Sequence, residues 1–183
     1  MVHEHVTLRD GRRVVVREVQ HRDGPGILHL LRDIASEQAY TLLEPQDIDA
    51  RAAAMLRDIG AEDPNELRLL ARCGEADTDV IADLTLGTKN FRRIAHVAKL
   101  GMEVRKDFRG VGLGDAMLRA ALAWAAQHPL IARVELQVFA DNARAVALYR
   151  KHGFVEEGRR SKYMHVGDQY LDDLIMGMFV KPI

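Results

Sequence analysis

The chain has 183 residues, of which 48% are hydrophobic and 29% charged, and its formal net charge is −1. This length and composition predict a single globular domain over residues 1–183. The near-zero net charge argues against a nucleic-acid partner, and the absence of a long apolar run argues against a membrane partner. The N-terminus lacks the pattern of a signal peptide, and the single Cys73 builds no disulfide framework, so we expect a cytoplasmic protein.

The first half of the chain alternates between strand and helix patterns. A short apolar run predicts a first strand, and apolar residues at helical spacing predict two helices, the second of which is closed by Gly60. Two further strands are expected to form a hairpin through a polar turn at residues 74–78. In order, these elements are Val14–Arg17, residues 24–39, residues 45–59, residues 67–71 and residues 80–86.

The second half continues with a long alternating run, which we interpret as a central strand. The elements expected here are strand 93–104, helix 111–127, strand 134–139, helix 142–151, strand 154–166 and strand 169–180. Six or seven strands with about four helices predict an α/β fold built on a mixed sheet.

The most informative segment is the glycine-rich run VRKDFRGVGLG at residues 104–114, between the central strand and a long helix. Glycines allow a tight turn and a close approach of a ligand to the backbone. The N–H groups of the loop and of the first helical turn then converge on one point, with the positive end of the helix dipole behind them. Lys106 and Arg109 add positive charge, so the segment is suited to bind a pyrophosphate.

Two other interpretations of this loop are open. A tight strand-to-helix turn needs the same glycines without any ligand. A dinucleotide-binding Rossmann unit would need G-x-G-x-x-G, whereas the glycines here follow G-x-G-x-G. The acidic residue expected at the end of the next strand is also misplaced, because Glu135 lies in the middle of its apolar run, and the Rossmann alternative is therefore disfavoured.

The pattern Arg109-x-x-Gly112-x-Gly114 after a strand resembles the (Gln/Arg)-x-x-Gly-x-(Gly/Ala) signature of the GNAT superfamily of acyl-CoA N-acyltransferases. Residues 142–154, NARAVALYRKHGF, are similar to the N-x-x-A-x-x-L-Y-x-x-x-G-F segment of the same family. The resemblance covers about residues 80–180. It implies a single GNAT-like domain that transfers an acetyl group from acetyl-CoA to an amine, without a metal.

The resemblance also implies which residues hold the acyl-CoA. The glycine loop would bind the pyrophosphate, and the end of the central strand would pair with the pantetheine arm and supply a backbone N–H to the thioester oxygen. Asn142 would contact the same arm, or act as a plain helix N-cap. The expected cofactor-binding residues are Met102, Glu103, Val104, Arg109, Gly110, Val111, Gly112, Leu113, Gly114, Asp115, Asn142 and Tyr149.

For catalysis, the resemblance favours Tyr149 as the acid that protonates the departing CoA thiolate, although a tyrosine at this spacing also suits a core position. The base is harder to assign. The glutamate that acts in the histone-acetylating branch aligns with Ala98. Strand alternation places His96 on the same face as Ala98 and Met102, so His96 is a candidate base, though a lone strand histidine is more often structural. Glu103 is expected to point to the opposite face and is therefore the less favoured candidate for the base.

The acceptor is expected to be a primary amine of a small molecule such as an amino acid or a polyamine. Tyr40 and Glu44 lie in the segment that commonly sets substrate choice in this family, and Arg93 could bind a carboxylate of the acceptor or belong to a solvated face. The late-strand pattern Gly167-x-x-Tyr170-x-Asp172-x-x-x-Met176 is instead similar to family members that acylate polyamines or the N-termini of ribosomal proteins. A non-catalytic acyl-CoA sensor is a further alternative, and a homodimer through the late strands is plausible because a sheet edge needs cover.

Overall fold

The computed structural model describes residues 2–59, 63–74, 79–88 and 91–182, and these form one eight-stranded sheet and four α-helices. The expected helix end at Gly60 and most of the expected turn at 74–78 lie outside the described residues. The elements are β1 (His3–Thr7), β2 (Arg13–Glu18), α1 (Gly24–Ser36), α2 (Pro45–Asp58), β3 (Glu66–Arg72), β4 (Val80–Thr88), β5 (Val97–Val104), α3 (Leu113–Gln127), β6 (Arg133–Phe139), α4 (Ala143–Lys151), β7 (Val155–Val166) and β8 (Gln169–Phe179).

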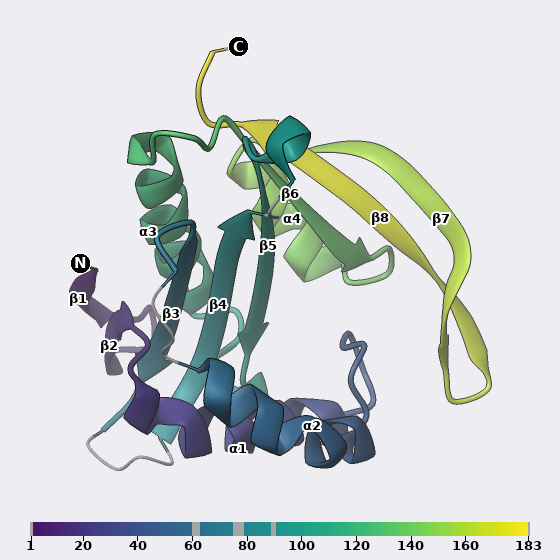
Figure 1. Cartoon of the computed structure of the whole chain (residues 1–183). Helices are drawn as coiled ribbons and strands as arrows, with labels where there is room; N and C mark the ends of the chain where they lie inside the picture. The colour runs from purple at the N-terminus through teal and green to yellow at the C-terminus, as the bar shows by residue number, and fades with distance from the viewer. Residues whose placement is uncertain (1, 60–62, 75–78, 89–90, 183) are drawn as a thin grey trace.

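The strands follow the spatial order β1-β2-β3-β4-β5-β6-β8-β7. Every neighbouring pair is antiparallel except β5 and β6, which are parallel and are connected through α3. The last two strands form a long hairpin that extends away from the rest of the molecule, with β7 at the edge of the sheet (Figure 1). The mixed α/β fold predicted from the sequence is thus confirmed, with one or two strands more than expected.

The parallel pair at the centre of the sheet is short. It covers four residue pairs, from Val97↔Arg133 to Leu100↔Leu136, although β5 continues to Val104 and β6 to Phe139. The two strands therefore separate toward their carboxyl ends. This separation creates a gap in the sheet at the point where the glycine-rich loop begins.

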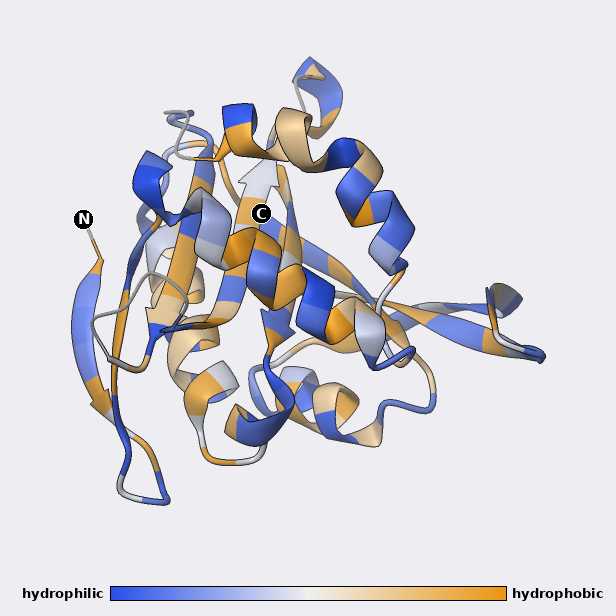
Figure 2. Ribbon diagram, turned by 90° about the horizontal axis from the view of Figure 1, so that it is seen from below, coloured by the Kyte–Doolittle hydropathy of each residue, from blue (hydrophilic) through white to orange (hydrophobic). Residues whose placement is uncertain are grey.

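Helices cover both faces of the sheet. On one face, α3 and α4 pack against the strands in the larger core; on the other, α1 and α2 form a second core with Leu70 and Val80 (Figures 1 and 2). The alternation of β3 explains this arrangement, because Leu69 and Ala71 enter the first core while Leu70 enters the second. Among the described helices, none combines the length and apolar composition needed to cross a membrane.

Two element boundaries and one additional strand differ clearly from the sequence-based expectation. The strand expected over 93–104 begins only at Val97, and Arg92–Ile94 forms a 3₁₀ turn in which Ile94 is 41% exposed, so the apolar–polar alternation there does not reflect burial. The first helix ends at Ser36, before Gln38 and Tyr40, which have positive φ angles. Strand β1 was not expected, because its sequence HEHVT is almost entirely exposed and carries little apolar signal.

Candidate active site

A cavity of about 770 Å³ opens at the carboxyl ends of β5 and β6. Its walls come from both faces of the sheet, with Ile34 and Tyr40 on the side of α1 and Leu148 and Tyr149 on the side of α4. The cavity therefore passes through the sheet where β5 and β6 separate. A ligand bound here can be reached from either face.

The glycine loop forms one wall of this cavity. Gly110 and Gly112 have φ angles of 77° and 98°, a region that glycine adopts without strain, and Gly112 is the N-cap of α3. The first helical amide to bond back is that of Ala116, which donates to the carbonyl oxygen of Gly112 at 3.1 Å. The amides of residues 113–115 precede it, so this helix end presents backbone donors and the positive end of its dipole to the cavity.

Gly114 is needed for a different reason, because a side chain at this position would crowd its neighbours. A β-carbon at this position would lie 3.2 Å from Cδ2 of Leu148 and 3.4 Å from Cε of Met102. Absence of a side chain thus allows α3 to approach both α4 and β5. The close approach brings the two sequence motifs into one site.

The turn between β1 and β2 holds the loop from outside. The Arg9 amide donates to the Val111 carbonyl at 2.9 Å, and Nη2 of Arg12 donates to the Asp107 carbonyl at 2.7 Å. The Arg12 guanidinium also stacks 3.8 Å from the ring centroid of Phe108. Sequence reasoning missed this support, because nothing in the local pattern of residues 9–12 indicates a contact about 95 residues away.

Arg109 has a structural partner. Its guanidinium forms a two-point ion pair with Glu37 at the end of α1, at 2.6 and 2.8 Å, and its Nε donates to the Val104 carbonyl at 2.7 Å. The Arg109 guanidinium, which was expected to add positive charge beside a phosphate, lines the cavity but is paired with Glu37. The cavity is also lined by three other cations, Arg9, Lys106 and Arg144.

Asp115 lines the cavity whereas Leu113 does not, and the side chains of both residues serve the fold. Leu113 is fully buried. The Asp115 carboxylate accepts hydrogen bonds from Lys151 and, at 3.0 Å, from Nε2 of His152, which joins α3 to α4. The hydrogen bond from Lys151 lowers the pKa of Asp115, so this carboxylate is ionised and occupied at neutral pH.

Asn142 and Tyr149 lie on the opposite wall. Asn142 caps α4, since its Oδ1 accepts from the Ala145 amide at 3.2 Å, and it also lines the cavity. Tyr149 is 6% exposed and packs edge-on against Phe154. Burial raises its pKa, as does the negative charge of Glu103, so the phenol keeps its proton and is suited to donate it.

The end of β5 contributes Met102, Glu103 and Val104 to the cavity wall. Glu103 lies directly opposite Asp83 of β4, and Asp83 forms an ion pair with Arg68 of β3 at 3.0 Å. Burial raises the pKa of Glu103 to about 7, the negative charge of Asp83 adds to this, and Arg68 opposes it. A carboxyl group with this pKa exchanges its proton at neutral pH.

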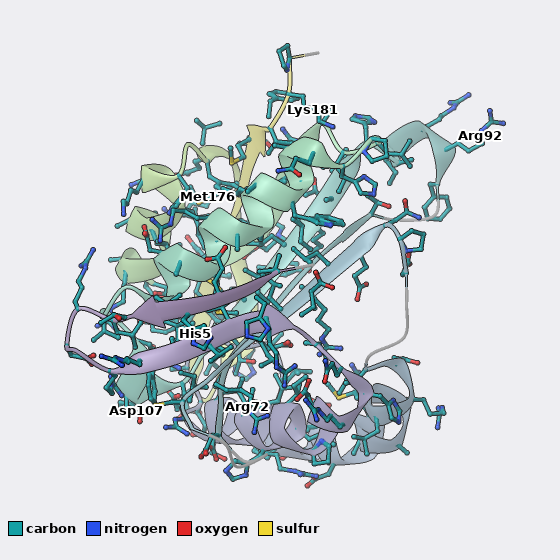
Figure 3. All side chains as sticks on the ribbon, turned by 90° about the vertical axis from the view of Figure 1, so that its left-hand side faces the viewer. His5, Arg72, Arg92, Asp107, Met176 and Lys181 are labelled. Carbon is teal, nitrogen blue, oxygen red and sulfur yellow. The ribbon has the colours of Figure 1, made fainter. Side chains whose placement is uncertain are left out.

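Of the four remaining predicted residues, the structure brings only Tyr40 to the cavity, where its ring lies edge-on to Phe139. Glu44 is exposed and caps α2. His96 and Arg93 precede β5, at the end of the molecule opposite the loop, as the positions of Arg92 and Asp107 show (Figure 3). These three residues are outside the cavity lining, and His96 instead accepts hydrogen bonds at its carbonyl from the amides of residues 132 and 133.

Within the described ranges, no group of three or more histidine, cysteine, aspartate or glutamate side chains is arranged to hold a metal ion. The features that the cavity does combine are a helix N-terminus, a set of cations, a protonated phenol and a carboxyl group that titrates near neutrality.

Known proteins are similar to this chain in sequence and in fold. A model of the Acetyltransferase (GNAT) family matches residues 28–154. The L-amino acid N-acetyltransferase AaaT of Escherichia coli (strain K12) is 31% identical over 165 residues, which is 89% of this chain and 96% of the relative.

Solved structures agree with this match. An acetyltransferase of the GNAT family from Streptococcus pneumoniae superposes with a TM-score of 0.78 at 24% identity, covering 91% of this chain and 98% of its own. The putative acetyltransferase yncA from Salmonella typhimurium, solved with its cofactor acetyl-CoA, gives 0.75 at 16% identity, covering 92% and 94%. The chain therefore belongs to the GNAT family and is an acyl-CoA-dependent acetyltransferase.

Proposed function

We propose that the protein transfers the acetyl group of acetyl-CoA to the primary amine of a small molecule, and that an L-amino acid is the first candidate acceptor. The observation that carries this proposal is the single cavity in which the loop at the start of α3 and the buried phenol of Tyr149 meet. The acceptor class is supported by the name of the relative from Escherichia coli, and the donor by the acetyl-CoA in the Salmonella structure.

Acetyl-CoA fits the distribution of charge and shape along the cavity. Its pyrophosphate would accept hydrogen bonds from the amides at the start of α3, with Arg9, Lys106 and Arg144 as counter-ions. Its pantetheine arm would occupy the gap between β5 and β6, alongside the backbone of residues 102–104 and near Asn142. Arg109 would act indirectly, by fixing the end of β5 to α1.

The amine would enter from the face of α1, where Ile34 and Tyr40 line the cavity. Attack of the neutral nitrogen on the thioester carbon forms the N–C bond, and the C–S bond then breaks. Tyr149 would give its proton to the sulfur, because its raised pKa keeps the phenol protonated until a strongly basic thiolate develops beside it. Transfer would be direct, since the one cysteine, Cys73, is not among the residues that line this cavity.

The test is release of CoA thiol from acetyl-CoA in the presence of an amine panel containing L-amino acids, polyamines and short peptides with free N-termini. We expect turnover with an amino acid and its loss in Tyr149→Phe. The matched control is Tyr170→Phe, because Tyr170 is an exposed tyrosine of the β7–β8 hairpin outside the cavity. Peptide-specific turnover would favour the protein N-terminal alternative, and tight acetyl-CoA binding without turnover would favour the sensor.

Three expectations from the sequence accompany this proposal. We propose a cytoplasmic enzyme without a nucleic-acid or membrane partner. We also propose a homodimer through β7, which lies at the sheet edge and carries the exposed apolar residues Val155 and Tyr163. Light scattering of the purified protein tests the dimer.

A further inference from the structure

The base that the sequence predicted for the acceptor amine does not lie in the cavity. An amine reaches the enzyme mainly as an ammonium ion and must lose a proton before it can attack. His96 lies outside the cavity, and the glutamate of the histone-acetylating branch aligns with Ala98, which is fully buried in the core. The acceptor of this proton has to be sought among the groups that line the cavity.

Among the residues that the structure describes, three carboxylates line it, namely Glu103, Asp115 and Asp141. Asp115 is occupied by Lys151 and His152, and Asp141 is exposed at the start of α4. Glu103 differs from these two carboxylates. It is partly buried, and its charge acts on the phenol of Tyr149. It is therefore the carboxylate that shares the interior of the cavity with the presumed acid.

The position of Glu103 follows from strand register. Leu70, Asp83 and Glu103 are direct neighbours across β3, β4 and β5, so their side chains share one face of the sheet. Because Leu70 belongs to the core of α1 and α2, this is also the face from which Tyr40 approaches the cavity. Met102 and Val104 point the other way, toward the core of α3.

We propose that Glu103 is the base that takes the proton of the acceptor amine, and that Asp83 and Arg68 act on it as positioning residues. The inference rests on the proposed function. Asp83 is 4% exposed and Arg68 holds it in an ion pair at 3.0 Å, so a fixed pair of charges lies behind Glu103, opposite the cavity. The charges of this pair act on the proton affinity of the Glu103 carboxylate.

The proton balance is complete with these groups. The ammonium gives one proton to the Glu103 carboxylate, which releases it to solvent, and the nitrogen lone pair then forms the bond to the thioester carbon. When the C–S bond breaks, its electron pair goes to sulfur, which takes the proton of Tyr149. Glu103 accepts the second proton of the nitrogen and passes it to the Tyr149 phenolate. One acetyl group has moved and one proton has been released.

The neighbours of Glu103 on each surrounding element define its titration. Asp83 of β4 forms an ion pair with Arg68 of β3; burial raises the pKa of Asp83 itself, and Arg68 opposes this. Tyr149 of α4 lines the same cavity as Glu103. The buried side of α1 is apolar there, with Ile34 in the cavity wall, and its Glu37 is taken by Arg109. With a pKa of about 7, Glu103 is partly ionised at neutral pH, so the rate should rise as pH increases through this value.

The experiment is the pH dependence of kcat/KM for wild type, Glu103→Gln, Glu103→Asp and Asp83→Asn, with the acceptor found in the amine panel. We expect Glu103→Gln to lower kcat/KM by roughly 10²–10⁴-fold and to remove the acidic limb near pH 7. Its dissociation constant for acetyl-CoA should stay close to that of wild type. Glu103→Asp should restore part of the rate together with an acidic limb.

The variant Asp83→Asn distinguishes the proposed electrostatic role of Asp83 from a merely structural one. Removing this negative charge lowers the proton affinity of Glu103, so the acidic limb should move to lower pH. Glu135→Gln on β6, outside the cavity, serves as the control and should leave the profile unchanged.

Each outcome bears on a separate claim. An acidic limb that persists in Glu103→Gln, or that stays in place in Asp83→Asn, overturns the inference while the enzyme assignment stands. If Glu103→Gln does not fold, the positions of the limb in Glu103→Asp and Asp83→Asn decide in its place. If wild type turns over no amine of the panel, the proposed function fails, and this inference fails with it.

Discussion

Replacing Glu103 by glutamine should stabilise the protein, and by an amount that grows with pH. The pKa of Glu103 rises from 4.5 to about 7 on folding, because burial and Asp83 disfavour the charged form. Between these values the folded state keeps a proton that the unfolded state has lost, so stability falls as pH rises from 4.5 to 7 and is level above. At about 1.4 kcal/mol per pKa unit, the raised pKa of Glu103 lowers the free energy of unfolding by about 3 kcal/mol above pH 7.

The expected gain is smaller than this limit. Glu103 is partly exposed, and water screens part of its charge, so we expect Glu103→Gln to gain about 1–3 kcal/mol at pH 8 and almost nothing near pH 4.5. Glutamine has nearly the same size as glutamate and does not ionise in this range. The difference in unfolding free energy between wild type and Glu103→Gln therefore reports the ionisation of Glu103.

Urea denaturation followed by circular dichroism at pH 5, 6, 7 and 8, at constant ionic strength, measures this difference. Glu157→Gln is a control of opposite sign. A hydrogen bond from Arg133 lowers the pKa of Glu157, so its contribution to stability is present above pH 4.5 and is lost only as pH falls through the lower folded value. Glu157→Gln should therefore lower stability equally at pH 6, 7 and 8. A difference for Glu103→Gln that is flat across pH, or negative at pH 8, would refute the reasoning.

The remaining predictions concern the site and its supports. Tyr149→Phe should lower kcat by roughly 10²–10³-fold with little change in the binding of acetyl-CoA, as steady-state kinetics and titration calorimetry can show; equal losses in both would contradict an acid role. Gly114→Val should destabilise the protein by about 1–3 kcal/mol and weaken acetyl-CoA binding, because its β-carbon would lie 3.2 Å from Leu148, whereas Gly114→Ala should be milder. Arg109→Lys should cost about 1–3 kcal/mol of unfolding free energy, since a lysine cannot hold both oxygens of Glu37 and the Val104 carbonyl. Glu37→Gln is its partner test, and two unaltered urea midpoints would show that this ion pair carries no stability.

The sequence is informative where a pattern is local. The period of the apolar residues and the two motifs predict the helices, most of the strands and the place of the glycine loop, and the matching family confirms the fold. Strand β1 was not predicted, because its residues are exposed and the strand is paired on one side only. The false start of β5 has the opposite cause, since Ile94 supplies an apolar position without being buried.

The candidate site is less predictable, because its charges are set by contacts between distant residues. Glu103 was expected as a backbone contact and as the less favoured base, and its proposed role in proton transfer follows only from its register with Asp83 and from the ion pair between Asp83 and Arg68. Likewise, the partner of Arg109 is 72 residues away in the sequence. The roles of Tyr149, Tyr40 and the cofactor-binding residues stay predictions until the proposed assays are done.

The short pairing of β5 with β6 has a consequence for how the molecule opens. Strands β1 to β5 form one continuous ladder and β6, β8 and β7 another, and four residue pairs join them, against seven each for β4–β5 and β6–β8. The β2–β3 pairing nearer the edge also has four residue pairs, but the β5–β6 seam is the short pairing in the middle of the sheet, and local opening is expected there. A ligand in the gap would bond to both ladders and would slow hydrogen exchange at the seam beyond the residues that it touches. Binding of the acyl donor would thereby add backbone hydrogen bonds between two groups of strands that otherwise share mainly a common apolar core.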